Sequence, residues 1–269
     1  MTATDSGIDA LAPVAGLSVT LADGVLSVTI NRPDSLNSVT TSVLAGIAEA
    51  MEAAARDPRV KVVRLGGAGR GFSSGAGIGA EDAADGVPTD IIVEANRAIR
   101  AITALPRPVV AVVQGPAAGV GVSLALACDL VLASEKAFFM LAFTKIGLMP
   151  DGGASALVAA AIGRIRAMRM ALLAERLPAT DALAWGLVSA VYPADTFDAE
   201  VDTVLAGLTA GAAVAFAKTK HAINSATLAE LHGALDREYV GQSILLAAND
   251  FREGVQSFQD RREPTFTDS

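Results

Sequence analysis

Alternating and continuous apolar stretches divide the chain into expected strands and helices. In residues 17–30, LSVTLADGVLSVTI, apolar and polar side chains alternate on both sides of Asp23-Gly24. This pattern is typical of a hairpin whose two strands are joined by a tight turn. We therefore expect the fold to begin with two antiparallel strands.

The middle of the chain alternates between expected helices and strands. Four apolar residues share one face of a predicted helix: Val43, Leu44, Ile47 and Met51. A short strand is expected at residues 60–65, and the run VVAVV at residues 109–113 is apolar throughout, as in a strand covered on both faces. An alanine-rich helix is expected after that run. Alternation of this kind predicts an α/β fold.

The C-terminal part of the chain predicts helices alone. From about Pro193 onward no segment has the period of a strand. Apolar residues recur there at helical spacing: Leu228, Leu231, Leu235 and Tyr239, then Phe251, Val255 and Phe258. We expect three parts: a loose extension over residues 1–14, an α/β core over residues 15–195 and a helical region over residues 196–269.

Composition and charge exclude several classes of function. The 269 residues are 52% hydrophobic, enough to bury one large core. The formal net charge of −8, with no basic patch, repels nucleic-acid backbones. No apolar run approaches the roughly 18 residues of a membrane span, and the first basic residue is Arg32. We expect a cytoplasmic protein without a nucleic-acid partner, a membrane span or a metal site, and with Cys128 as a buried, inert thiol.

Two glycine-rich turns follow expected strands, GAGRGFSSGAGIGA at residues 67–80 and GPAAGVGVS at residues 115–123. Glycine lets a ligand approach the backbone, and the first amides of a helix are unpaired donors with partial positive charge. Two such amides aimed at one oxygen form an oxyanion hole. Turns of this kind are also common in α/β proteins as plain connections, and neither matches a phosphate-binding loop.

Six segments, in order over residues 17–266, resemble the enoyl-CoA hydratase/isomerase, or crotonase, superfamily. They are INRPDSLNSV, GRGFSSGAGI, VQGPAAGVGVSLALACDLVLAS, FTKIGLMPDGGAS, RMALLAERLPATDALAWGLVSAVYP and RREPTF. The resemblance implies a spiral of ββα units over residues 15–195, followed by an all-helical C-terminal region that forms a homotrimer or a dimer of trimers. It also implies that an acyl-CoA thioester is the substrate, with no separate cofactor.

The resemblance further implies a set of site residues. The amides of Ser74 and Val120 take the two oxyanion-hole positions and, with Asp151, form the expected catalytic set. The expected substrate-binding residues are Leu36, Ser74, Ala76, Gly77, Ile78, Gly119, Ser123 and Phe143. Gly77 stands where the family usually has an aspartate, which we expect to loosen the CoA-binding edge.

Two departures from the family pattern bear on the reaction. Hydratases of the family carry one glutamate at the position of Ser123 and another at the position of Phe143. Hydration needs an activated water and a proton donor, and neither a serine hydroxyl nor a phenyl ring moves protons near neutral pH. Conventional hydratase activity is therefore disfavoured.

One acid remains at a useful position. Asp151 matches the place where some isomerases of the family, and an aryl-CoA dehalogenase branch, have their catalytic aspartate. Apolar neighbours such as Met140 and Met149 would raise the pKa of its carboxyl and make it a stronger base. A single carboxylate suffices to isomerise a double bond through an enolate. The alternative is that Pro-Asp-Gly is an ordinary turn.

Other functions remain as alternatives. The chain could be an enoyl-CoA hydratase of the fatty-acid β-oxidation type, or an acyl-CoA-binding protein without catalysis. GVSLA at residues 121–125 comes close to a serine-hydrolase motif, with His221 or His232 as base, but its serine lies within the expected helix. Lys218 and Lys220 are candidates for binding a CoA phosphate.

Overall fold

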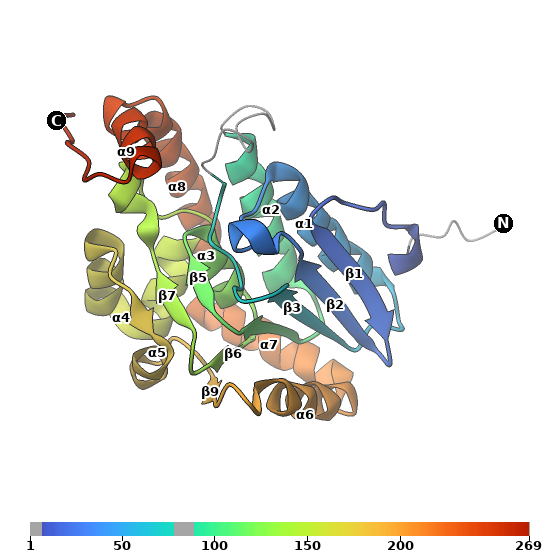
Figure 1. The fold of residues 1–269 in the computed structure, drawn as a ribbon. Helices are drawn as coiled ribbons and strands as arrows, with labels where there is room; N and C mark the ends of the chain where they lie inside the picture. The colour runs from blue at the N-terminus through green and yellow to red at the C-terminus, as the bar shows by residue number, and fades with distance from the viewer. Residues whose placement is uncertain (1–6, 78–88, 269) are drawn as a thin grey trace.

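A computed structural model describes residues 7–77 and 89–268 of the chain. Figure 1 shows a central sheet with helices packed on both of its faces and a group of helices at the C-terminal end. Ile78, which the sequence places among the substrate-binding residues, lies outside the described residues.

The central sheet has six strands in the order β1-β2-β3-β4-β6-β9. Their bounds are β1 Leu17–Ala22, β2 Val25–Ile30, β3 Val62–Gly67, β4 Val109–Val113, β6 Leu130–Ser134 and β9 Ala190–Tyr192. Strands β1 and β2 pair antiparallel, whereas every other neighbouring pair is parallel. The predicted hairpin and the predicted strands at residues 60–65 and 109–113 are therefore confirmed, with the first of these strands shifted by two residues.

The hairpin turn depends on two residues with left-handed backbone. Asp23 has φ of 50° and Gly24 has φ of 82°. Positive φ at both central positions is the geometry that matches the twist of two adjacent strands. The turn sets the register, so that Leu26, Val28 and Ile30 all face the core and are fully buried.

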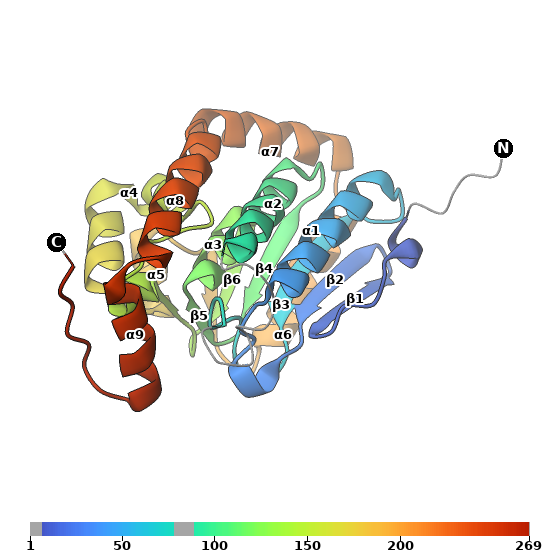
Figure 2. The ribbon, with the colours of Figure 1, turned by 90° about the horizontal axis from the view of Figure 1, so that it is seen from above.

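Helices cover the two faces of the sheet unequally. On one face lie α1 (Thr41–Arg56), α2 (Asp90–Ala104) and α3 (Val120–Ala127), and these bury the main apolar core (Figure 2). On the other face lies α6 (Phe197–Thr209), whose Phe197, Val201 and Leu205 pack on β3, β4 and β6. The first face is the one that carries the candidate site.

A second, three-stranded sheet was not predicted. It consists of β5 (Pro116–Ala118), β7 (Phe138–Met140) and β8 (Leu177–Pro178). These strands are two or three residues long, which is too short for a periodic pattern. The helices α4 (Ala154–Leu173) and α5 (Ala179–Trp185) follow β7 in the chain and flank this sheet. Short 3-10 helices within the described ranges lie at Ile8–Ala10, Pro33–Ser35 and Ala142–Ile146.

The C-terminal region consists of helices, as predicted. After β9 the described residues form α6, α7 (Ala213–Thr227), α8 (Leu231–Leu246) and α9 (Asn249–Asp260). Helix α8 packs on α4 and α2, which brings the C-terminal region back onto the α/β core. No single helix among the described residues has the length and apolarity to cross a bilayer; α6 and α7 pass that test only as a pair bent by 104°.

The N-terminal extension is less loose than expected. Its described part, residues 7–14, contains a 3-10 helix whose Ile8 is buried in the main core. The Ile8 amide donates to Oδ2 of Asp57 at 3.3 Å, and Asp57 is itself held by Arg59 at 2.7 Å. The guanidinium keeps the pKa of the Asp57 carboxyl well below its usual range. This part of the extension is therefore fixed to the core.

Candidate active site

Residues 72–77 run between two other backbone segments. On one side they pair with residues 36–39, and on the other side Ser73 pairs in parallel with Ala117 of β5. The Ser74 amide belongs to the first pairing, because it donates to the Leu36 carbonyl at 2.9 Å. The expectation that Ser74 supplies an oxyanion-hole amide is therefore wrong for this conformation, since that donor is already used.

The neighbouring residue Ala76 has the opposite orientation. Val39 and Ala76 form a parallel bridge in which the Val39 amide donates to Gly75 and the Gly77 amide donates to Val39. In such a bridge the amide of Ala76 itself points away from Val39. The segment on that side is the turn before α3: a Cβ added to Gly75 would lie 2.9 Å from the Ala118 carbonyl oxygen. The Ala76 amide therefore faces the N-terminus of α3.

Val120 is the first residue of α3 and completes this arrangement. The amides of a helix's first turn have no partner within the helix. Gly119, which precedes it with φ of 55°, donates its own amide to the Met140 carbonyl at 3.0 Å and lies against the ring of Phe143. The predicted residues Gly119, Val120 and Phe143 are thus brought together, beside Ala76.

Asp151 lies against the first turn of α3. Its carbonyl oxygen accepts the Ser123 hydroxyl at 2.8 Å. A Cβ added to the following Gly152 would lie 3.1 Å from a methyl carbon of Val120. Ser123 is fully buried and uses its hydroxyl in this bond, so its predicted contact with substrate is replaced by a contact that fixes Asp151.

The Asp151 carboxyl is held by a residue from the C-terminal region. Gln242 of α8 donates its amide to Oδ2 of Asp151 at 2.8 Å. Burial raises the pKa of the Asp151 carboxyl to about 7; the Gln242 hydrogen bond opposes this rise, and the charge of Glu238 adds to it. A carboxyl with a pKa near neutrality is suited to accept and return a proton.

Glu238 caps the N-terminus of α4. Its Oε2 accepts the Gly153 amide at 2.6 Å, and its Oε1 accepts the amide and the hydroxyl of Ser155, the amide at 2.8 Å. Burial raises the pKa of Glu238, while these donors favour its ionised form. A carboxylate at a helix N-terminus is further stabilised by the helix dipole.

The sequence analysis did not identify Gln242 or Glu238. They lie about 90 residues beyond Asp151, on a helix whose other buried residues include Leu231 and Leu235. One signal was available: positions 231, 235, 238 and 242 share one face of a helix. Polar residues that continue an apolar face indicate buried polar contacts.

Lys220 is not free to bind a CoA phosphate. Its ammonium donates to the carbonyls of Ile102 and Arg107 and to Oδ2 of Asp129 at 2.9 Å, and its side chain is 8% exposed. This expectation is therefore wrong, because Lys220 joins α7 to the core instead. Lys218 is exposed.

The serine-hydrolase alternative is also excluded by geometry. His221 and His232 are exposed residues of α7 and α8, whereas Ser123 is fully buried and bonded to the Asp151 carbonyl. Cys128 is buried, as expected, and burial raises the pKa of its thiol far above the usual range. Within the described ranges no group of three or more His, Cys, Asp or Glu residues could hold a metal ion.

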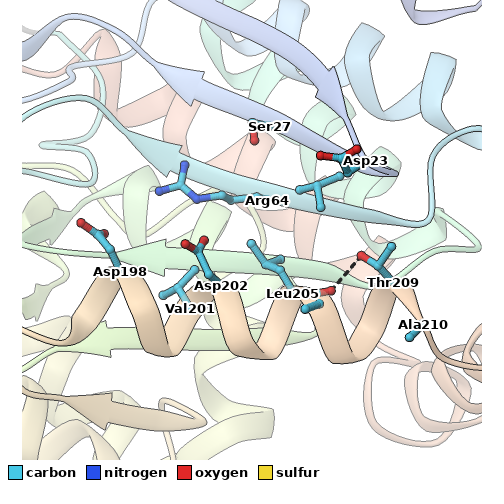
Figure 3. Close-up of a pocket in the computed structure, with 11 residues that line it drawn as sticks. Asp23, Ser27, Arg64, Asp198, Val201, Asp202, Leu205, Thr209 and Ala210 are labelled. Atoms are coloured by element: carbon cyan, nitrogen blue, oxygen red, sulfur yellow. Dashed lines mark hydrogen bonds between the residues drawn. The ribbon is translucent and has the colours of Figure 1, made fainter.

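A pocket of about 770 Å³ lies on the opposite face of the sheet (Figure 3). It is enclosed by the hairpin turn, β3 and α6, and its charged lining residues are Arg64, Asp23, Asp198 and Asp202. Three carboxylates beside one guanidinium repel phosphate groups. This pocket is therefore a poor site for CoA, and the predicted site residues do not line it.

The chain is similar to several known proteins over nearly its whole length. A family model described as enoyl-CoA hydratase/isomerase matches residues 20–269. The chain is 36% identical to 1,2-epoxyphenylacetyl-CoA isomerase of Escherichia coli (strain K12), over 91% of this chain and 95% of that protein. It is 37% identical to a probable enoyl-CoA hydratase of Rhodobacter capsulatus, over 92% and 96% respectively. A crystal structure of an enoyl-CoA hydratase from Mycobacterium avium subsp. paratuberculosis K-10 is 74% identical, with a TM-score of 0.91 over 95% of this chain and 100% of that chain.

The raised pKa of Asp151 predicts a pH-dependent loss of stability. The pKa is 3.8 in the reference state and about 7 in the fold, so the folded protein holds this proton more tightly than the unfolded chain. The stabilising contribution is fully present below pH 4 and is lost as the pH rises through 7. We expect Asp151→Asn to gain about 2 kcal/mol relative to wild type between pH 5.5 and pH 8, measured by urea unfolding. An equal difference in unfolding free energy between Asp151→Asn and wild type at pH 5.5 and pH 8 would contradict the raised pKa of Asp151.

Proposed function

The chain belongs to the enoyl-CoA hydratase/isomerase family, and we propose that it isomerises the double bond of an enoyl-CoA thioester through an enolate, with Asp151 as the acid–base residue. The observation that carries this proposal is Asp151, whose backbone lies against the first turn of α3 and whose carboxyl is buried with a pKa near 7. The positions where hydratases of the family carry their glutamates hold Ser123 and Phe143.

We propose that the oxyanion hole consists of the amides of Ala76 and Val120. The Val39–Ala76 bridge turns the first amide toward α3, and the second is the first amide of that helix. Both would donate to the thioester oxygen, where negative charge develops in the transition state. The helix dipole of α3 adds partial positive charge at the same place.

The reaction then needs one proton carrier. Asp151 removes a proton from carbon 2 of a 3-enoyl thioester, and the electrons of that C–H bond delocalise onto the thioester oxygen as a dienolate. The protonated Asp151 returns the same proton to carbon 4, and the double bond forms between carbons 2 and 3. No water is consumed, and the carboxylate is regenerated.

Hydration of a 2-enoyl-CoA is the second candidate, because the 74% identical crystal structure is that of an enoyl-CoA hydratase. Hydration requires a base for water and a separate acid. Of the two carboxyls buried at the candidate site, Asp151 and Glu238, the second has both oxygens occupied by donors from Gly153 and Ser155. Only Asp151 is therefore available for proton transfer at this site, which favours isomerisation over hydration.

The exposed apolar residues support assembly into the trimer or dimer of trimers. Apolar side chains that are largely exposed lie on α4 and α8: Ile165, Leu172 and Leu173 on the first, Val240 and Ile244 on the second. These helices pack on each other. Exposed apolar side chains on neighbouring helices are typical of subunit interfaces.

Asp151→Asn is expected to abolish most of the isomerase activity. An amide cannot accept the proton, so kcat for a 3-enoyl-CoA should fall by a factor on the order of 10² to 10⁴ with little change in affinity for the thioester. Ser123→Ala, which alters only a bond to the Asp151 backbone, should change kcat slightly. Activity assays with 3-enoyl-CoA and 2-enoyl-CoA separate the candidates: binding without turnover of either would indicate the non-catalytic alternative, and preferential hydration would favour the second.

Val120→Pro is expected to remove one oxyanion-hole donor while keeping the helix. Proline is well tolerated at the first position of a helix but has no amide hydrogen. We expect a loss of kcat of about 10²-fold, whereas Val120→Ala, which keeps the amide, should lose far less. Steady-state kinetics with circular dichroism as the folding control measures both. Equal losses in the two variants would rule out the Val120 amide as a donor.

The assembly is expected to contain three or six chains. If the apolar residues on α4 and α8 are buried between subunits, the protein should remain a single oligomeric species at micromolar concentration. Light scattering coupled to gel filtration measures this mass. A stable monomer would contradict the proposed assembly without affecting the proposed chemistry.

A further inference from the structure

The Gln242 side chain is fixed in one orientation by three hydrogen bonds. Its Oε1 accepts the Met149 amide at 3.2 Å, and its Nε2 donates to the Met149 carbonyl at 3.0 Å and to Oδ2 of Asp151 at 2.8 Å. The backbone of Met149 thus determines which end of the amide faces the carboxyl. A flip of the amide would place two acceptors, Oε1 and Oδ2, against each other.

The two oxygens of Asp151 are consequently unequal. Oδ2 is occupied by the Gln242 amide. Among the described residues no donor bonds to Oδ1 of Asp151. In these ranges the one fully buried side-chain oxygen or nitrogen without a hydrogen-bond partner is Oδ1 of Asn96, so Oδ1 of Asp151 is not fully buried. Oδ1 is therefore the oxygen that keeps access to the space outside the protein core.

We propose that Gln242 is a positioning residue that keeps Oδ2 of Asp151 as a hydrogen-bond acceptor throughout the reaction, so that Oδ1 alone takes the proton and returns it. This inference rests on the proposed isomerisation. A protonated Oδ2 would direct its O–H at a group that can only donate, Nε2. The proton therefore stays on Oδ1.

A single carrier oxygen has a stereochemical consequence. A proton taken and returned by Oδ1 leaves and enters on the same face of the dienolate. The carboxyl cannot rotate to present its second oxygen without breaking the Gln242 bond. Deuterium placed on carbon 2 of the substrate should therefore appear on carbon 4 of the product in preference to exchanging with solvent.

The groups around Asp151 come from three helices, and the two that act on the charge of its carboxyl both lie on α8. Helix α8 contributes Gln242, which donates a hydrogen bond, and Glu238, the charged group that acts on this carboxyl among the described residues. Helix α3 contributes Ser123, bonded to the Asp151 carbonyl, and α4 contributes Ser155, bonded to Glu238; neither carries a charge. Gln242 and Glu238 therefore push the pKa of Asp151 in opposite directions.

These opposed effects allow a sharp experiment. Gln242→Leu removes the donor and should move the acidic limb of kcat/KM to higher pH by about one unit or more, because a hydrogen bond to a charged group is lost. Gln242→Glu, which keeps the shape, should move it in the same direction. Glu238→Gln removes the neighbouring charge and should move it to lower pH. The matched control is Gln256→Leu, since Gln256 also donates to an aspartate, Asp260, but on the surface of α9; it should move nothing.

Two further measurements complete the test. Carbon-13 NMR titration of the aspartate carboxyls in the free enzyme, assigned with Asp151→Asn, should show the same directions of shift. In the Gln242 variants kcat should fall about tenfold or more at constant KM, and the transfer of deuterium from carbon 2 to carbon 4 should decrease in favour of solvent exchange.

The outcomes separate this inference from the proposed function. An active wild type whose Asp151 titration and deuterium transfer are unchanged by Gln242→Leu and Gln242→Glu would overturn the positioning role alone. A wild type that does not isomerise 3-enoyl-CoA would overturn the proposed function and the positioning role together, even if the NMR titration shifts as expected. Opposite shifts in the Gln242 and Glu238 variants, with loss of deuterium transfer, would support it.

Discussion

The burial of one ionisable carboxyl is the constraint around which the candidate site is organised. Asp151 is 8% exposed, and burial opposes its ionisation. The fold meets this constraint where three helices converge: α3 holds the Asp151 backbone through Ser123, α8 holds the carboxyl through Gln242, and the N-terminus of α4 begins three residues later under the Glu238 cap. The C-terminal helical region is therefore part of the candidate site rather than an appendage to it.

The backbone ladder around residues 72–77 imposes the second constraint. Successive amides in this segment point to opposite sides, so a shift of one residue changes which neighbouring segment each amide faces. Gly75, with φ of 92°, interrupts this alternation, so that the amides of Ser74 and Ala76 face opposite sides. Sequence motifs identify the segment but not the orientation of each amide. For this reason the sequence pointed to Ser74, whose amide bonds to Leu36, whereas the pairing of Val39 turns the Ala76 amide toward α3.

Secondary structure could be predicted from the sequence where the local hydrophobic pattern and the tertiary environment favour the same conformation. Strong alternation around Asp23-Gly24 and the apolar run at residues 109–113 each determine one structure, and both were predicted correctly. The strands β5, β7 and β8 could not be predicted, because pairs and triplets of residues acquire their conformation from neighbouring strands. The prediction that Lys220 binds a phosphate was wrong for a related reason. A lysine in a helix is expected to be solvated, and the sequence does not reveal the two carbonyls and the carboxylate that surround this one.

The residues at the two positions where the family resemblance leads us to expect glutamates both lie in the candidate site. Ser123 binds the Asp151 carbonyl, and Phe143 lies against Gly119 at the start of α3. A glutamate at position 123 would add a negative charge next to Asp151, whose carboxyl pKa is already raised by burial and, to a lesser extent, by the charge of Glu238. That charge would hold Asp151 in its protonated form and remove the base at neutral pH. The proposed isomerisation depends on a single buried carboxyl, and such a site is expected to exclude other charges from the first turn of α3.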